Sequence, residues 1–295
     1  MRRLATLSAT VLIACLTLTA PAGATFPGTN GDIAFTRSIR NQTEIFVVDP
    51  DTGGTIRLTR TPRARETMPD WNADGTRIVY SRCGRGEFSN CDLWVMDADG
   101  SNQTRITTTP DAQETWPSWS PDGVHIAYTS NELDPFQDIW VIHDDGSKAT
   151  QLTTFTGFDA FPEWSPNGAR IAFTSDRADF NDIWVMDADG SDPTQITFGA
   201  KIDERPDWSP NGARLTFSRN GNIWVVDADG SDGLGLTRNR RHEFNPTFSP
   251  DGTRIAYSRI GTDDRAGIWV MGADGSSPQQ LTFGRLDFFP DWQPV

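Results

Sequence analysis

The segment from Pro117 to Tyr128 reads Pro-Ser-Trp-Ser-Pro-Asp-Gly-Val-His-Ile-Ala-Tyr. It places an aromatic anchor before a proline-containing turn, and a short strand after that turn. Similar segments recur along the chain, and their anchors are Trp71, Trp119, Trp164, Trp208, Phe248 and Trp292. The anchors lie 48, 45, 44, 40 and 44 residues apart. A repeat of this length, made only of strand and turn signals, predicts the blade of a β-propeller.

Each repeat predicts four short strands. The first carries the anchor and ends at a Pro-Asp-Gly or Pro-Asn-Gly turn, and the second follows at once, as in residues 77–80. The third, such as residues 139–142, is apolar at successive positions, which indicates a sheet covered on both faces. The fourth is a brief segment such as residues 151–153. These patterns predict an all-β fold of four-stranded antiparallel blades.

The two ends of the repeat region complement each other. Residues 30–35, 44–48 and 56–59 predict a second, third and fourth strand without a first one. Residues 289–292 supply a first strand alone, so Trp292 should lie alongside Ile33. A blade made of three N-terminal strands and one C-terminal strand closes the ring and removes its exposed edges. We therefore predict a six-bladed propeller over residues 27–295.

Ten of the eleven tryptophans occupy two fixed positions of the repeat. Five are anchors, and the other five lie in third strands: Trp94, Trp140, Trp184, Trp224 and Trp269. Such regularity predicts packing between blades, not a set of binding sites.

The N-terminal segment predicts export. Arg2 and Arg3 precede an apolar stretch that ends at small residues, so residues 1–24 are interpreted as a signal peptide and the mature protein as secreted or periplasmic. The stretch is short for a membrane span, and no span is expected after its removal. Alternatively, Leu12-Ile13-Ala14-Cys15 resembles a lipoprotein cleavage box, with the protein anchored at Cys15. The net charge of −14 argues against a nucleic-acid partner, because phosphates would be repelled.

Two cysteines, Cys83 and Cys91, remain in the predicted mature chain, on either side of a glycine-containing loop. In an exported protein two cysteines across a hairpin loop most simply form a disulfide. Metal binding is the alternative, but neither a second cysteine pair nor a nearby histidine completes a site.

An acidic residue lies five positions before every anchor. The six are Glu66, Glu114, Asp159, Asp203, Glu243 and Asp287. At the start of the innermost strands they would face one mouth of the central channel, where converging carboxylates would hold Ca²⁺ or another cation. The alternative is that each carboxylate binds loop amides or a nearby arginine and fixes its blade.

The three histidines and the second turns offer weaker signals. His242 adjoins Glu243 and is the candidate ligand or proton carrier at the predicted mouth. His143 lies at a turn, and His125 begins a second strand at a position held by arginine in other repeats. Turns such as residues 97–100 contain Asp-x-Asp-Gly, as calcium loops do, but they lack the distal glutamate and are explained by turn chemistry.

The Trp-Ser-Pro-Asp-Gly, Ile-Trp-Val-Met-Asp-Ala-Asp-Gly-Ser and Gln-Leu-Thr segments together resemble the TolB-like six-bladed propeller repeat, a WD40-like pattern. The resemblance covers residues 27–295 and implies a propeller-only, exported member of that family. TolB itself is periplasmic and acts in an envelope-spanning complex. The fold alone does not fix the function, because this repeat serves many roles.

From these observations we expect a non-catalytic, monomeric propeller that binds a protein, peptide or envelope ligand through the channel mouth or rim loops. The alternative is a propeller enzyme of the polysaccharide lyase or hydrolase type, with a metal-assisted site in the channel. Such an enzyme would need histidine, arginine or tyrosine clustered with carboxylates at one mouth.

Overall fold

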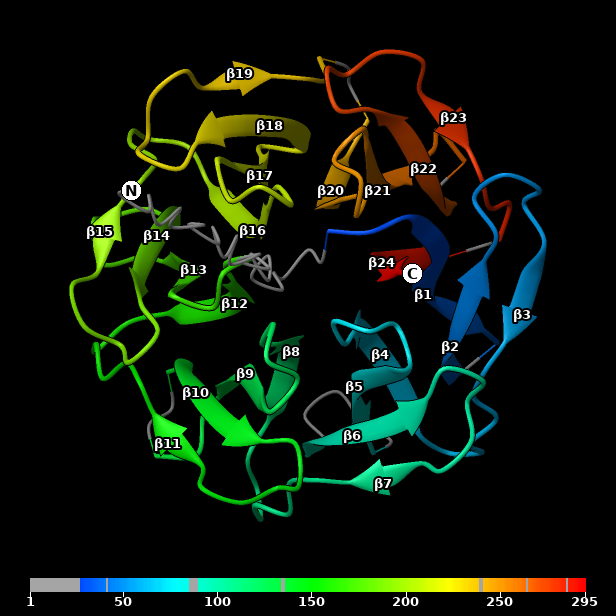
Figure 1. Ribbon diagram of the computed structural model, residues 1–295, viewed down its shortest axis with the longest axis horizontal. Helices are drawn as coiled ribbons and strands as arrows, with labels where there is room; N and C mark the ends of the chain where they lie inside the picture. Colours follow the sequence, from blue (N-terminus) through cyan, green and yellow to red (C-terminus); the bar gives the residue numbers. More distant parts are fainter. Residues whose placement is uncertain are drawn as a thin grey trace, which may run out of the picture.

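The computed structural model describes residues 27–40, 42–84, 90–133, 136–238, 241–263, 265–284 and 286–295. Every regular element in these ranges is a β-strand, and the sheets are arranged in a ring around a central axis (Figure 1). The predicted signal peptide and Cys15 lie outside the described residues. The all-β prediction is confirmed.

The strands fall into four classes by their place in the repeat. The inner strands are β4 (Arg65–Trp71), β8 (Glu114–Trp119), β12 (Asp159–Trp164), β16 (Asp203–Trp208), β20 (Glu243–Phe248) and β24 (Asp287–Pro294). The second strands are β1 (Asn30–Ile39), β5 (Arg77–Cys83), β9 (His125–Ser130), β13 (Arg170–Ser175), β17 (Arg214–Arg219) and β21 (Arg254–Ile260). The third strands are β2 (Gln42–Val48), β6 (Cys91–Asp97), β10 (Asp138–His143), β14 (Asp182–Asp187), β18 (Asn222–Asp227) and β22 (Ala266–Gly272). The short outer strands are β3 (Thr55–Arg57), β7 (Thr104–Arg105), β11 (Thr150–Gln151), β15 (Thr194–Gln195), β19 (Leu234–Gly235) and β23 (Gln279–Gln280).

Four blades are separate four-stranded antiparallel sheets: β8–β11, β12–β15, β16–β19 and β20–β23. The remaining strands form one eight-stranded sheet that contains β24-β1-β2-β3 and β4-β5-β6-β7. Its two halves are joined by a single parallel pair, Thr43 opposite Arg65. Each inner strand contacts the next one along the chain, and β24 contacts β4.

The first and last strands of the described chain lie side by side. Strand β24 pairs antiparallel with β1 and places Trp292 opposite Ile33, which confirms the predicted pairing (Figure 1). Thr29 and Val295 exchange backbone hydrogen bonds of 2.9 and 3.1 Å. The first strand of one repeat is therefore supplied by the opposite end of the chain.

The anchor residues pack between neighbouring sheets. Trp119 is 1% exposed and shares one hydrophobic cluster with Val79 and Leu93 of the preceding strands β5 and β6, and with Ile126 of its own blade. Trp208 likewise joins Ala172 and Ile183 of the β12–β15 blade to Leu215 of its own. The prediction that the anchors are packing residues is confirmed.

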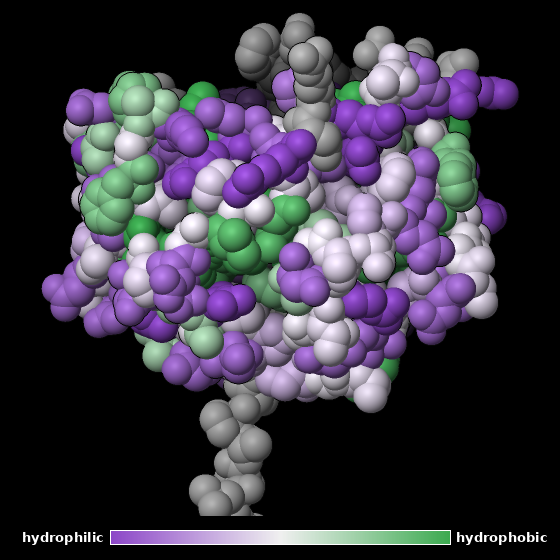
Figure 2. Space-filling model, turned by 90° about the horizontal axis from the view of Figure 1, so that it is seen from above, coloured by the Kyte–Doolittle hydropathy of each residue, from purple (hydrophilic) through white to green (hydrophobic). Residues whose placement is uncertain are grey.

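The outer edge of the ring is mainly hydrophilic. Figure 2 looks at this edge and shows polar residues around a smaller hydrophobic group. Among the described residues there is no helix with the length and hydropathy needed to cross a bilayer.

Candidate functional site

The six acidic residues before the anchors are buried inside their own blades, each 0 or 1% exposed. Each begins, or is the second residue of, an inner strand, where it faces the second strand of the same sheet. In β4, for example, Glu66 lies directly opposite Arg82 of β5.

Arginine side chains pair with five of the six. The pairs are Glu66–Arg82 at 2.7 Å, Asp159–Arg177 at 2.7 Å, Asp203–Arg219, Glu243–Arg259 at 3.4 Å and Asp287–Arg37 at 2.7 Å. Each arginine also lies over an aromatic ring of the third strand, at 3.9 Å for Trp94, 5.0 Å for Trp184, 4.8 Å for Trp224, 4.4 Å for Trp269 and 4.9 Å for Phe46. Each carboxylate is thus neutralised by a cation within its own blade.

This geometry does not support a shared cation site at these residues. No group of three or more His, Cys, Asp or Glu side chains is placed to hold a metal ion in the part of the chain that the structure describes. The side chain of His242 is exposed, while neighbouring Glu243 is buried, so the two do not form a joint site. Five of the six acids form separate pairs with arginine, because the inner strands turn their first acids toward their own sheets.

Glu114 is the exception. Its partner on β9 is Ser130, where four other blades have an arginine. Both carboxylate oxygens are buried, and neither has a hydrogen-bond partner among the described residues. Burial raises the pKa of Glu114, and the nearby Thr107 and Thr109 hydroxyls offset only part of that rise in pKa.

The central axis is lined by two other positions of the repeat, one and three residues before each anchor. Together with the intervening prolines they surround an axial pocket of about 100 Å³, to which all the inner strands contribute. The residues three before the anchor, here called the collar, are Met68, Trp116, Phe161, Arg205, Asn245 and Phe289. Those one before the anchor are Asp70, Ser118, Glu163, Asp207, Thr247 and Asp291; all but Ser118 line the pocket.

A bulge in every inner strand aims the collar at the axis. Each collar residue precedes a proline and has a positive φ, between 54° and 60°. Proline has no N–H to donate to the ladder, and strand pairing shifts there, as between Thr67 and Asp70. Hydroxyls of the preceding blade accept the collar N–H groups in several repeats; the Phe161 N–H, for example, donates to Thr129 Oγ1 at 3.1 Å. Positive φ is costly for such side chains, and functional sites are common places for it.

Arg205 lies within an aromatic group in the collar. Its guanidinium is 4.7 Å from the ring centre of Trp116, 5.0 Å from that of Phe161 and 5.8 Å from that of Phe289. It donates a hydrogen bond to Asn245 Oδ1, but its Nε is buried without a partner. Among the described residues no carboxylate forms an ion pair with it. Burial lowers the pKa of Arg205 to about 10, and the charge of the neighbouring Glu204 offsets only part of that fall in pKa.

Four carboxyl groups line the axial pocket at the position one residue before the anchor: Asp70, Glu163, Asp207 and Asp291. Burial first, and then the charges of Asp291 and Asp207, raise the pKa of Asp70 well above its usual value. Burial and the other three carboxylates likewise raise the pKa of Glu163, and burial raises the pKa of Asp291 to about 7. The Asp291 carboxylate accepts a hydrogen bond from the backbone N–H of Trp71 at 2.7 Å, and the Asp70 carboxylate accepts one from the backbone N–H of Trp119 at 2.7 Å. These acids therefore link neighbouring blades as well as line the axis.

The sequence contained a signal for the collar that was missed. Trp116 is the one tryptophan outside the two fixed positions of the repeat. The collar position also changes from copy to copy, whereas the anchor and the first acid are nearly constant. A position that varies inside a regular repeat is free of the packing that fixes the others, and here it faces the axis.

The Asp-x-Asp-Gly turns are held by ordinary turn hydrogen bonds. In each, an aspartate accepts the N–H of the serine two residues later, as Asp99 does from Ser101 at 2.9 Å. The Ser101 hydroxyl and then the Ser101 N–H lower the pKa of Asp99, and the corresponding serine contacts lower the pKa of Asp145, Asp189, Asp229 and Asp274. Turn geometry accounts for these carboxylates without a cation.

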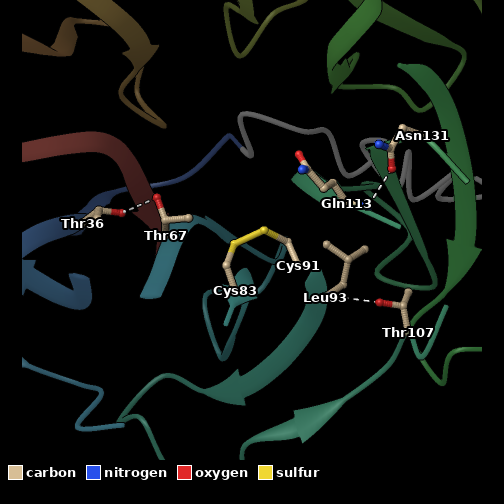
Figure 3. Close-up of a disulfide and its surroundings, with 8 residues drawn as sticks. All are labelled: Thr36, Thr67, Cys83, Cys91, Leu93, Thr107, Gln113 and Asn131. Carbon is tan, nitrogen blue, oxygen red and sulfur yellow. Dashed lines mark hydrogen bonds between the residues drawn. A yellow bond between two sulfur atoms is a disulfide. The ribbon is translucent and has the colours of Figure 1, made fainter. Parts of the chain in front are cut away.

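Cys83 and Cys91 form a disulfide (Figure 3). They lie directly opposite each other at the end of the β5–β6 pair. The predicted disulfide is confirmed, and it joins the ends of β5 and β6; residues 85–89 between them lie outside the described ranges.

Comparison with known families identifies the repeat. Residues 114–295 match the TolB beta propeller domain, a region that covers more than half of the chain. The chain belongs to the TolB beta propeller domain family. The TolB-like resemblance predicted from the sequence is therefore confirmed.

Solved structures agree with this TolB-like fold. TolB from Acinetobacter baumannii superposes with a TM-score of 0.79 at 21% identity, over 90% of this chain and 67% of that one. A putative TolB from Agrobacterium tumefaciens gives 0.71 at 21% identity, over 90% and 99% of the two chains. An oligogalacturonate lyase from Vibrio parahaemolyticus gives 0.58 at 14% identity, over 80% and 73%. A search of curated proteins found no match.

Proposed function

We propose that this TolB-like propeller is an exported, non-catalytic, monomeric binding module that takes a segment of a protein or peptide at its axial pocket. The observation that carries the proposal is Arg205, a half-buried guanidinium whose Nε is fully buried without a hydrogen-bond partner, and which forms no ion pair with a carboxylate among the described residues. A buried charge is normally paired, because desolvation without compensation is costly. A carboxylate from a ligand would supply the missing partner.

The surroundings of Arg205 suit a peptide. Phe161 contacts Phe158 at 5.7 Å between ring centres, and Phe289 contacts Phe288 at 5.9 Å. Phe288 in turn lies 5.7 Å from Phe244. This aromatic track leads outward from the collar to the side of the ring where the inner strands begin. Aromatic side chains and arginine are the residues most enriched at the centres of protein interfaces.

The ring geometry places this pocket at the centre of the molecule. We infer that the eight-stranded sheet is two blades joined by the single Thr43–Arg65 pair, so the ring has six blades. The pairing of β24 with β1 supports closure by the two chain ends. Export is supported by the disulfide, since such bonds persist in oxidising compartments.

A peptide selection tests the proposal. A phage-displayed peptide library is selected on the wild-type protein, and the affinities of the selected peptides are measured for Arg205→Gln and for Arg214→Gln. Arg214 on β17 serves as the matched control, because it is an exposed arginine that forms an ion pair with Asp227 on β18. We expect selected peptides to contain Asp or Glu and to lose about tenfold or more in affinity for Arg205→Gln alone. Equal binding to both variants contradicts the proposal.

A lyase or hydrolase is the second candidate. Carboxyl groups with raised pKa values in one pocket, including Asp291 at a pKa of about 7, are typical of acid–base sites. The fold resemblance to an oligogalacturonate lyase agrees with this alternative. Arg205 lies in the same pocket as these carboxyl groups and meets part of the requirement for an enzyme, whereas no histidine or tyrosine is among the described residues that line the pocket. Turnover of an acidic oligosaccharide that is abolished by Asp291→Asn would favour the enzyme.

A further inference from the structure

A second cavity lies away from the axis, between the β8–β11 and β12–β15 blades, which are neighbours in the ring (Figure 1). Its volume is about 730 Å³, within the range of small-ligand sites. Leu152, Val141 and Trp164 form its apolar part, and His125 and His143 lie at its polar wall.

The cavity coincides with a break in the repeat. At three other junctions an arginine that begins the second strand lies over the anchor of the next blade. These contacts are Arg77 over Trp119 at 4.8 Å, Arg170 over Trp208 at 4.9 Å and Arg254 over Trp292 at 5.0 Å. His125 holds the arginine position beside Trp164. Because imidazole is shorter than the arginine side chain, it leaves space that a guanidinium would occupy.

His125 and His143 are a directly opposed cross-strand pair on β9 and β10. Their ring centres are 4.8 Å apart, with the planes at 79°. Two imidazole nitrogens that bind one tetrahedral ion at about 2.0–2.1 Å hold their ring centres roughly 5 Å apart. The observed spacing therefore suits joint coordination of one ion without a change in the sheet.

Asp122 completes the arrangement from the turn before β9. Its Oδ2 lies 3.0 Å from His125 Nδ1. Histidines that bind metals commonly donate their second ring N–H to a carboxylate, which orients the ring and leaves the other nitrogen free as a ligand. The Asp122 carboxylate is fixed in place, because its Oδ1 accepts hydrogen bonds from the Val124 N–H at 2.8 Å and from the Ser120 hydroxyl.

The geometry points to a two-histidine site for a divalent transition-metal ion of the Zn²⁺, Cu²⁺ or Ni²⁺ class. His125 Nε2 and one nitrogen of His143 would be the protein ligands, and Asp122 a positioning residue. With two protein ligands, the other positions on the ion face the cavity and would be filled by water or by a ligand group. The inference does not depend on the axial pocket, which lies elsewhere in the ring.

Zinc titration tests the site. Binding of Zn²⁺ to the full-length, untagged protein is measured by calorimetry, in a Cys15→Ser background that leaves no free thiol beside the disulfide. We expect one ion per chain. His125→Arg, which restores the arginine of other repeats, and His143→Asn should each weaken binding at least tenfold. Asp122→Asn should weaken it about 10–100-fold, as loss of an orienting carboxylate does.

The third histidine gives the matched control, since His242→Asn should bind Zn²⁺ as the wild type does. Ca²⁺, which prefers oxygen ligands, should not compete. Electron paramagnetic resonance with Cu²⁺ should show two nitrogen ligands in the wild type and one in His143→Asn. Equal zinc binding by the wild type and His125→Arg, or loss of binding only in His242→Asn, would overturn the inference.

Discussion

Replacing either of two glutamates at the same place in the repeat by glutamine should have opposite effects on stability. Glu66 is paired with Arg82, whereas Glu114 faces Ser130 and is buried without a cation. Glu66→Gln should therefore lower the free energy of unfolding at pH 7 by about 3 kcal/mol, because it leaves the Arg82 guanidinium buried and unpaired. Glu114→Gln should raise it, because a costly buried charge is removed. Urea denaturation of both variants measures the difference.

The pH dependence separates these two cases further. Burial raises the pKa of Glu114 above the 4.5 of an exposed glutamate, so the folded chain holds this proton to higher pH than the unfolded chain does. Stability contributed by this residue is therefore lost as the pH rises from 4.5 through the folded-state pKa. The advantage of Glu114→Gln should disappear below pH 4.5. Ser130→Arg, which supplies the missing cation, should also stabilise the protein at pH 7; a destabilised Glu114→Gln at that pH contradicts this account.

At the scale of the strand, the sequence predicted where the strands of each repeat lie. It did not predict which side chains of the inner strands point toward the axis. Anchor, turn and third-strand patterns predicted the strands closely. The first acid was predicted to face the channel mouth because it lies where the chain enters the inner strand. The bulge between Thr67 and Asp70, and its counterparts, adds a residue, so side chains on its two sides change faces. The collar therefore reaches the axis, and Glu66 turns into the blade.

The β5–β6 hairpin carries the disulfide, and its removal should weaken this element. Cys83 and Cys91 are 8 residues apart in the sequence, and closing a loop of this size is worth about 2–3 kcal/mol in the unfolded chain. Cys83→Ser combined with Cys91→Ser should lower the free energy of unfolding by about that amount. Dithiothreitol should have the same effect on the wild type and none on the double variant. An unchanged urea midpoint after verified reduction would show that strand pairing alone holds the hairpin.

At the scale of the whole molecule, stability depends on the pairing of β24 with β1. Deleting residues 288–295 removes Trp292 from the cluster that contains Ile33 and Phe35, and exposes the edge of β1. Thermal unfolding should then become broader and begin at lower temperature. Deletion of Val295 alone is the control, because it removes the hydrogen bonds with Thr29 and keeps the strand. A sharp, unshifted transition after the larger deletion would show that the pairing is dispensable.

The meeting of Thr29 and Val295 also has a use in protein engineering. In a chain from which the residues before Thr29 are removed, a short peptide linker could join Val295 to Thr29, and the backbone could be opened instead at an exposed connection between two of the separate blades. The rearranged polypeptide would begin and finish at a blade boundary, so every sheet would be made from one continuous stretch of chain. Folding of such a permutant would no longer wait for the last-synthesised strand to find the first.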